Sequence, residues 1–342
     1  VSWNATVLGR YQSGAFGGKL AYPLLWVGAA AQAARTGRPL CWNAPGVKRV
    51  PGSPHVRALL RTTVAASAYI SVRDTFSRDC LRSLEPGKEI HVVPDTGLEV
   101  ADLWPAADLG SDHAAVLESA GFAPSTETLA VHVNRHYAGG DATAAARAID
   151  RAAGRSGLVP LLVGLGPVHG DTEFAGEVAA ALTVPHVVLA SPAHLRQAAA
   201  AIGRSRAYVG SSMHGMITAL SFGLPGLMVV REGGPELNPK FSSLLQPLGL
   251  GGQMCEGWEA APGALEKTLS LPESTWTSVL PRVLPELDSH WSRVSETFSS
   301  LTKQPMNNYT ELGRLWTTAL CLGGENAFSR YFEELLAADR KA

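Results

Sequence analysis

A histidine at the start of a predicted helix could bind an anion and exchange a proton with it. The apolar run at 207–209 predicts a buried strand, and His214 falls in the first turn of the helix that follows. Ligands of open α/β sheets bind at the carboxyl ends of strands, and the N–H groups of a helix start favour anions. Serine is also a good N-cap residue. The candidates here are His214 as the reacting group and Ser211, Ser212 and Gly215 as binding residues.

Further polar side chains follow other predicted strands, so they would gather at the same edge of a sheet. Arg73 and Asp95 follow two strands of the first half, and Arg135 follows a strand of the second half. Cationic side chains suit the binding and activation of an anion. Each has an ordinary alternative, because Arg73 could form a local ion pair and Asp95 could cap a turn. Arg73 and Asp95 join His214 as the catalytic candidates. The remaining binding candidates are Arg78, Asn134, Arg135, His136, His169 and Lys240.

Alternating strand and helix patterns predict an α/β fold with two Rossmann-like domains and parallel sheets. Short connections rich in Gly and Pro are typical of right-handed crossovers in such sheets. The predicted strands are 5–8, 39–43, 69–72, 89–93, 129–133, 158–163, 186–189, 207–209 and 227–230. The predicted helices are 20–35, 54–65, 75–84, 141–153, 172–182, 192–202 and 213–222, with Asp171 and Ser191 as two of the N-caps.

The polar stretch 110–128 predicts the joint between the two halves. We therefore expect an N-terminal Rossmann-like domain at 1–120, which could be truncated at its start, and a C-terminal one at 121–270. A helical extension at 271–342 would pack back on the domains. Apolar side chains recur there at helical spacing, which predicts an amphipathic helix. They are Leu287, Trp291, Val294 and Phe298.

The composition is that of a soluble globular protein and excludes several classes of function. The chain has 342 residues, of which 46% are hydrophobic and 17% charged, with a net charge of −1. No basic excess points to nucleic acid, and no apolar run is long enough to span a membrane. The four cysteines are scattered without zinc-site spacing, so we expect buried thiols in a reducing compartment.

Common catalytic motifs are missing from the sequence. The G-x-S-x-G of serine hydrolases does not occur around Ser212, and no H-E-x-x-H suggests a metal site. The short Gly-Leu-Gly-Pro at 164–167 lacks the rest of a dinucleotide fingerprint. Acidic residues are too sparse in the predicted cleft for the paired carboxyl groups of a glycosidase. His132 alternates to the opposite face of its strand, so we expect it to pack in the core or on the surface.

Three motifs in this order resemble the polysaccharide pyruvyl transferase family. They are SVRDTFSRDCL at 71–81, VVPDTGL at 92–98 and VGSSMHGMITALSFGLPGLMVV at 209–230, followed by a lysine in PKFSSLL. The resemblance covers residues 7–298. It implies a fold similar to GT-B glycosyltransferases, with the active site in the interdomain cleft. The family's motif residues fall on His214 and Arg73, and more loosely on Arg135 and Lys240.

The resemblance also implies the reaction. Phosphoenolpyruvate would be the donor, and a sugar of a glycan or lipid-linked precursor would be the acceptor of a pyruvate ketal. His214 would protonate the donor's methylene carbon. Alternatively, His214 only binds phosphate, and Asp95 or His136 moves the protons. No metal or other cofactor is required. Many members carry arginine at the position of Ser212, so here Arg135 or the helix N–H groups must supply that contact.

Two other functions remain open at this point. A GT-B glycosyltransferase would hold the diphosphate of a nucleotide sugar in the same cationic cleft, with Glu232 or Glu236 on its ribose. A non-catalytic glycan-binding homologue is the second alternative, favoured by Ser212. The family resemblance implies a cytoplasmic place, near the inner face of the membrane where lipid-linked glycans are built. The sequence does not determine the oligomeric state.

Overall fold

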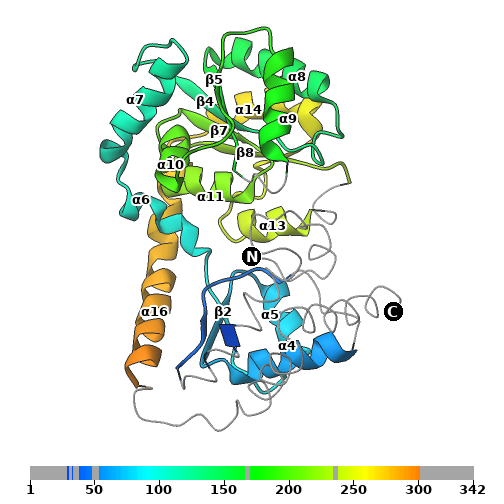
Figure 1. Cartoon of the computed structure of the whole chain (residues 1–342), viewed down its shortest axis with the longest axis vertical. Helices are drawn as coiled ribbons and strands as arrows, with labels where there is room; N and C mark the ends of the chain where they lie inside the picture. Colours follow the sequence, from blue (N-terminus) through cyan, green and yellow to red (C-terminus); the bar gives the residue numbers. More distant parts are fainter. Residues whose placement is uncertain are drawn as a thin grey trace, which may run out of the picture. The chain divides into compact units, whose positions relative to one another are not determined.

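A computed structural model of the chain describes residues 29–30, 33, 38–47, 54–165, 170–233 and 238–300 (Figure 1). The chain forms two compact units. Unit 1 contains residues 1–96 and 285–342, and unit 2 contains residues 97–284. All strand pairs in the described residues are parallel. The predicted α/β fold with two Rossmann-like, parallel-sheet parts is confirmed.

The sheet of unit 2 has the strand order β6-β5-β4-β7-β8-β9. The chain therefore builds outward in one direction from β4, returns, and builds outward in the other direction from β7. This is the doubly wound order, and its switch point lies between β4 and β7. The strands are β4 (Thr128–His132), β5 (Val159–Val163), β6 (Val187–Leu189), β7 (Ala207–Gly210), β8 (Gly226–Val230) and β9 (Met254–Glu256).

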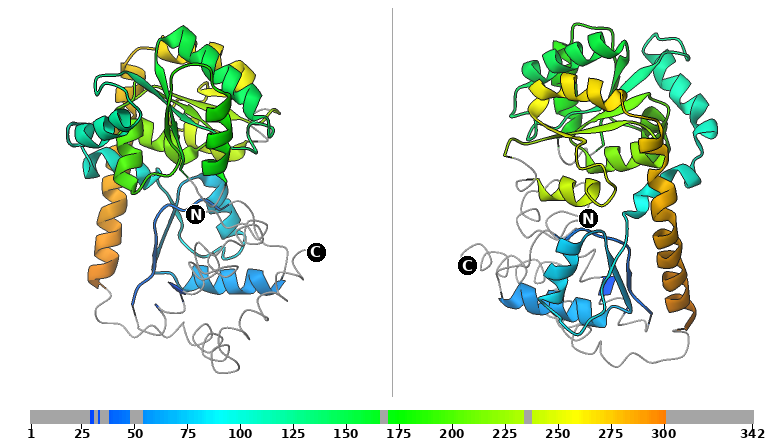
Figure 2. Two further views of the ribbon diagram at one scale, coloured as in Figure 1. Left: turned by 45° about the horizontal axis from the view of Figure 1, so that its top comes forward. Right: turned by 180° about the vertical axis from the view of Figure 1, so that it is seen from behind.

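Helices cover both faces of this sheet (Figure 2). Apolar side chains of β4, β7 and β8 pack with α8, α9 and α14 in one cluster, and side chains of β5 and β6 pack with α7 and α10 in another. The helices are α6 (Val100–Leu103), α7 (Gly110–Ser119), α8 (Ala142–Ser156), α9 (Asp171–Ala181), α10 (Leu195–Gly203), α11 (Met213–Ser221), α13 (Pro239–Leu245), α14 (Gly257–Leu269) and α15 (Ser274–Thr277), with the 3₁₀ turns Thr96–Glu99 and Ala106–Leu109.

Unit 1 contains a sheet of the order β1-β2-β3 in its described part. Tyr69 to Val72 form an apolar run with one serine, and this run is buried along its whole length. Such a run is expected in a parallel sheet covered on both faces. The elements are β1 (Cys41–Trp42), α4 (Pro54–Ala66), β2 (Tyr69–Val72), α5 (Thr75–Arg82), β3 (His91–Val92) and α16 (Val279–Ser300), of which residues 285–300 belong to unit 1.

The positions of the predicted strands from 39 onward are confirmed, with ends that differ by up to a few residues. The strand at 5–8, most of the helix at 20–35 and everything after residue 300 lie outside the described residues. Within the polar stretch at 110–128, α7 forms and packs on α10. Residues 97–120 accordingly pack within unit 2, and the division at 1–120, 121–270 and 271–342 stays a prediction.

Both predicted N-caps are wrong. Gly170 caps α9 without a side chain, so the Asp171 side chain is available for other contacts. His194, rather than Ser191, caps α10 and accepts a hydrogen bond from the Gln197 backbone N–H at 3.1 Å.

The buried side of α16 also differs from the predicted stripe. Val283, Leu287 and His290 are buried, whereas Trp291 is 40% and Phe298 51% exposed. At about 100° per residue, His290 lies about 60° to one side of Leu287 and Trp291 about 40° to the other, so Trp291 lies at the edge of the buried side. Among the described helices, none is both long and apolar enough to span a membrane.

Candidate functional site

The ends of β4 and β7 meet at the switch point of the unit 2 sheet. His132 pairs in register with Gly210, and the Ser211 N–H donates to the His132 carbonyl at 3.2 Å. A Cβ atom at Gly210 would lie 2.5 Å from that carbonyl oxygen, so glycine allows the strands to approach. The predicted gathering of residues 134–136 and 211–214 at one sheet edge therefore follows from the topology.

The start of α11 is built as predicted around Ser212. This residue is the N-cap, and its Oγ accepts from the Gly215 N–H at 3.3 Å. The buried Tyr208 hydroxyl donates to the Ser212 carbonyl at 3.0 Å and accepts from its N–H at 3.2 Å. Burial raises the pKa of Tyr208, which keeps this hydroxyl a neutral donor. Gly215 leaves room for Tyr208, and His214 is exposed in the first turn.

A buried polar network at the end of β4 contains Asp171, a residue that the sequence did not mark as functional. Its Oδ2 accepts from His132 Nε2 at 3.0 Å, and its Oδ1 accepts from Asn134 Nδ2 at 2.7 Å. The His132 and Asp171 side chains are 3% and 5% exposed. Asn134 Oδ1 in turn accepts from the His136 N–H at 3.0 Å. Asp171 thus fixes the turn that carries the candidates Asn134 and His136.

Two polar atoms at this edge have no hydrogen-bond partner in the described part of the chain. They are His132 Nδ1 and Ser211 Oγ, and both are buried. His132 is therefore packed in the interior, as its strand alternation predicts. Unpaired buried polar atoms are rare in folded proteins and call for an explanation such as a bound molecule or a functional role.

The candidates Arg135 and His136 point toward different partners. Arg135 forms an ion pair with Glu177 of α9, and its guanidinium carbon lies 4.8 Å from the centre of the Phe174 ring. His136 Nε2 lies 3.3 Å from Nη1 of Arg231. Arg231 directly follows β8, so the rule that selected Arg135 could have found it as well.

Lys240 lies in the first turn of α13, with its Nζ 5.1 Å from the centre of the Phe241 ring. The buried Asn238 connects the start of this helix to the end of β8, because its side chain bonds both to the N–H and to the carbonyl of Arg231. His169 lies outside the described residues, and so does Glu236.

In unit 1 the structure brings the candidates Arg73 and Asp95 together. Arg73 Nη1 lies 3.5 Å from Asp95 Oδ2, and the two side chains are 12% and 15% exposed. Asp74 caps α5 by accepting from the Ser77 N–H at 2.6 Å, and it also lies 3.8 Å from Arg73 Nε. Gly46 has no side chain where the guanidinium passes. The ordinary alternative for Arg73, a local ion pair, is thus observed together with the contact to Asp95.

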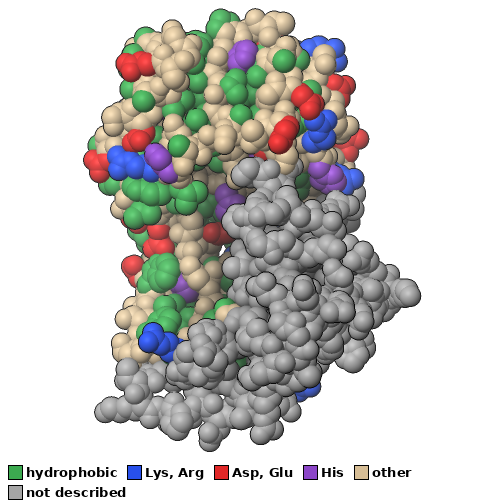
Figure 3. Space-filling view, in the orientation of Figure 1, with side chains coloured by type: hydrophobic (Ala, Val, Ile, Leu, Met, Phe, Trp, Pro, Cys, Tyr) green, Lys and Arg blue, Asp and Glu red, His purple; other side chains and the backbone are tan. Residues whose placement is uncertain are grey.

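Arg78 does not join this cluster. Its Nε bonds to the neighbouring Asp79 at 2.9 Å. No group of three or more potential metal ligands occurs among the described residues. On the face drawn in Figure 3, acidic and basic side chains are interspersed over the described surface. That mixture agrees with the near-neutral net charge.

The doubly wound sheet, with polar side chains at its switch point, defines a Rossmann-like α/β protein. The chain belongs to the polysaccharide pyruvyl transferase family, whose sequence profile matches residues 12–233. The members of this family are transferase enzymes, and the motifs at 71–98 and 209–245 resemble the motifs of this family. No curated protein sequence matches the chain.

Several solved structures are similar to this chain at low sequence identity. One is the α,α-trehalose 6-phosphate synthase of Burkholderia multivorans, with 15% identity, 79% of this chain and 68% of that chain covered, and a TM-score of 0.47. The UDP-forming α,α-trehalose-phosphate synthase of Burkholderia xenovorans has 12% identity, 83% and 79% coverage, and a TM-score of 0.48. The UDP-GlcNAc 2-epimerase of Neisseria meningitidis has 14% identity, 77% and 72% coverage, and a TM-score of 0.43.

Proposed function

We propose that the protein transfers pyruvate from phosphoenolpyruvate to two hydroxyl groups of a sugar, forming a ketal and releasing phosphate. The family supports this reaction, and the observation that carries it is the position of His214. This histidine lies in the first turn of α11, at the switch point of a parallel sheet. Helix N–H groups can bind an anion and an imidazole can exchange a proton, so this position would suit both steps.

Phosphoenolpyruvate carries a phosphate and a carboxylate, and both need donors. The N–H groups at the start of α11 and the Ser211 hydroxyl would supply some of them. Arg135 and Lys240 are the further cationic candidates of unit 2, and Arg73 is the candidate of unit 1. Ser212 caps the helix through its side chain, so it cannot replace the arginine found at this position in many family members.

The proton steps of the reaction balance within the site. His214 donates a proton to the methylene carbon, which leaves positive charge at the adjacent carbon. A sugar hydroxyl adds there and loses its proton, and a second hydroxyl then displaces phosphate to close the ketal. The first hydroxyl's proton can restore His214, while the second leaves with phosphate or solvent. The chemistry requires no metal and no other cofactor.

The acceptor would be a sugar of a polysaccharide or of a lipid-linked precursor. Such a substrate would place the enzyme in the cytoplasm, near the inner face of the membrane.

The proposal is tested with His214→Ala. We expect phosphate release from phosphoenolpyruvate, in the presence of sugar acceptors, to fall by about 10²–10⁴-fold, because general acid catalysis contributes that much. The matched control is His186→Ala, since His186 begins the segment leading into β6 and bonds only to the nearby Val184 carbonyl among the contacts described. A loss below tenfold would remove His214 from the acid role.

Ligand binding separates this function from its alternatives. Phosphoenolpyruvate should raise the melting temperature of the wild type, and His214→Ala should weaken this effect. Stabilisation by a UDP-sugar instead would indicate a glycosyltransferase. Binding that survives in His214→Ala, with no phosphate release from any combination of substrates, would indicate a non-catalytic homologue.

A further inference from the structure

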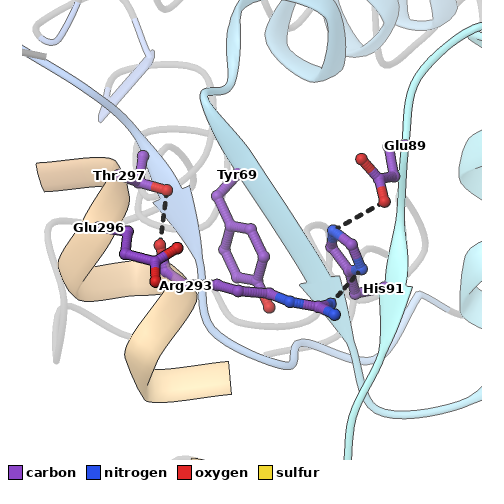
Figure 4. Close-up of a pocket in the computed structure, with 6 residues that line it drawn as sticks. All are labelled: Tyr69, Glu89, His91, Arg293, Glu296 and Thr297. Carbon is purple, nitrogen blue, oxygen red and sulfur yellow. Dashed lines mark hydrogen bonds and ion pairs between the residues drawn. The ribbon is translucent and has the colours of Figure 1, made fainter. Parts of the chain in front are cut away.

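Unit 1 contains a pocket of about 500 Å³ on the side of its sheet that faces α16. The lining side chains come from β2, from β3 and the residues just before it, and from α16 (Figure 4). Tyr69 begins β2, whereas Arg73 follows its other end, so the pocket is separate from the pair formed by Arg73 and Asp95. Its lining residues are Tyr69, Glu89, His91, Arg293, Glu296 and Thr297.

The polar groups of this pocket hold one another in place. Arg293 Nη1 donates to His91 Nδ1 at 2.7 Å, and His91 Nε2 lies 3.5 Å from Glu89 Oε1. Burial, and then the neighbouring Arg293, lowers the pKa of His91, so the ring is neutral with its proton on Nε2. The His91 ring stacks on Tyr69 with ring centres 5.1 Å apart, and because Tyr69 is buried, the aromatic side of the pocket is formed chiefly by His91.

A second histidine, His290, holds the Tyr69 side chain of the pocket in place. The Tyr69 hydroxyl donates to His290 Nδ1 at 2.9 Å, and His290 Nε2 donates to Asn43 Oδ1 at 3.0 Å. His290 is only 1% exposed, and both of its ring nitrogens are satisfied. The Tyr69, His91 and Arg293 side chains are therefore already ordered, whereas the Glu89 side chain is 82% exposed and would be ordered when a ligand binds.

The charges of the pocket decide which class of ligand it suits. The lining contains one guanidinium, Arg293, and two carboxylates, Glu89 and Glu296, and His91 is neutral, so the lining is not cationic. A phosphate or carboxylate ligand would be repelled, and no group of three potential metal ligands occurs in the described residues. A lipid would need a larger apolar surface than the aromatic side provides. A ligand with hydroxyl groups suits the lining, because each hydroxyl can accept a hydrogen bond from Arg293 and donate one to Glu89 or Glu296.

We propose that this pocket binds a neutral, polyhydroxylated ligand with the chemistry of a sugar ring. In the bound state the Glu89 and Glu296 carboxylates accept hydrogen bonds from ligand hydroxyls, Arg293 donates to them, and the His91 ring, stacked on Tyr69, covers one face. The volume is within the range of about 300–1,000 Å³ that is usual for small-molecule sites. This binding does not require that the protein transfers pyruvate.

The test uses the full chain and the methyl glycosides of glucose, galactose and mannose, observed by saturation-transfer NMR. We expect saturable binding of at least one glycoside in the millimolar range. The double substitution Glu89→Gln/Glu296→Gln should weaken this binding at least fivefold. Glu286→Gln is the matched control, because Glu286 is exposed on the same helix and does not line the pocket. Neither change removes a buried group.

Two further variants separate this pocket from the proposed active site. Binding should persist in His214→Ala and in Arg73→Gln, even where these lose pyruvyl transfer. The inference is overturned if none of the three glycosides saturates below about 100 mM, a limit near 1.4 kcal/mol of binding free energy. It is also overturned if the double variant binds like the wild type, or if inorganic phosphate displaces the glycoside through contacts to Arg293.

Discussion

Two buried histidines, one in each unit, differ in how completely their rings are hydrogen-bonded. His290 in unit 1 has a partner on each nitrogen, Tyr69 and Asn43. His132 in unit 2 bonds to Asp171 through Nε2, but its buried Nδ1 has no partner among the described residues. A closed network stabilises the packing of a helix on a sheet. An open one leaves hydrogen-bonding capacity at the edge where ligands of such sheets bind.

The largest effect should come from removing Asp171. Asp171→Ala leaves His132 Nε2 and Asn134 Nδ2 without an acceptor in the interior, and each such loss costs about 1–3 kcal/mol. Asn43→Ala is the counterpart in unit 1 and leaves only one donor, His290 Nε2, without an acceptor. We therefore expect Asp171→Ala to lower the free energy of unfolding by about twice as much as Asn43→Ala. Urea denaturation measures both values.

Enzyme activity should also distinguish the two hydrogen-bond networks. Asp171→Ala should also reduce pyruvyl transfer, because it releases the turn that carries Asn134 and His136. Asn43→Ala should leave kcat and KM close to the wild-type values under conditions where it is folded. Equal losses of activity in the two variants at equal stability would mean that the open network of unit 2 has no special relation to the site.

The next largest effects should come from two glycines, one in each unit. In unit 2, a Cβ at Gly210 would lie 2.5 Å from the His132 carbonyl oxygen, and two hydrogen-bonded strands cannot separate to make room. Gly210→Ala should therefore cost about 1–3 kcal/mol of stability, as overpacking of a core does. In unit 1, the three atoms nearest to a Cβ at Gly46 would all belong to the end of the Arg73 side chain, which can move.

Gly46→Ala should thus have little effect on stability but should displace the Arg73 guanidinium from Asp95. If Arg73 binds substrate, kcat/KM falls while the urea midpoint stays within experimental error of the wild type. Arg73→Gln is the reference for full loss of that contact. A stable Gly46→Ala protein with wild-type kcat/KM would argue against a substrate-binding role for Arg73.

Local sequence patterns predicted most of the described fold, because they depend on neighbours in the chain. The apolar run at 69–72 and the serines before α11 are both of this kind. Asp171 was misread, since an aspartate at a helix start is usually a cap, whereas its partner His132 is 39 residues away. His290 and Tyr69 are 221 residues apart, and no local pattern records such a pair. The candidate residues of the site stay predictions in both units.

The smallest effect should be the dependence of unit 1 on pH. Burial, followed by the nearby charges, lowers the pKa of His290 and of His91 from the ordinary 6.5. The folded state then binds fewer protons than the unfolded state. The stability that these rings contribute is complete above pH 6.5 and is lost as the pH falls through their folded-state pKa values. At low pH each ring would have to accept a proton next to the positive charge of Arg293, which is unfavourable.

Urea denaturation at a series of pH values between 7.5 and 5 checks this expectation. The wild type should lose more stability over this interval than His290→Gln, since glutamine does not take up a proton there. NMR titration of the ring protons gives the second readout, and both histidines should titrate below 6.5. If His290 titrates above that value, the ring is charged in the folded state. The bonds to Tyr69 and Asn43 would then not form the closed, neutral network that distinguishes unit 1 from unit 2.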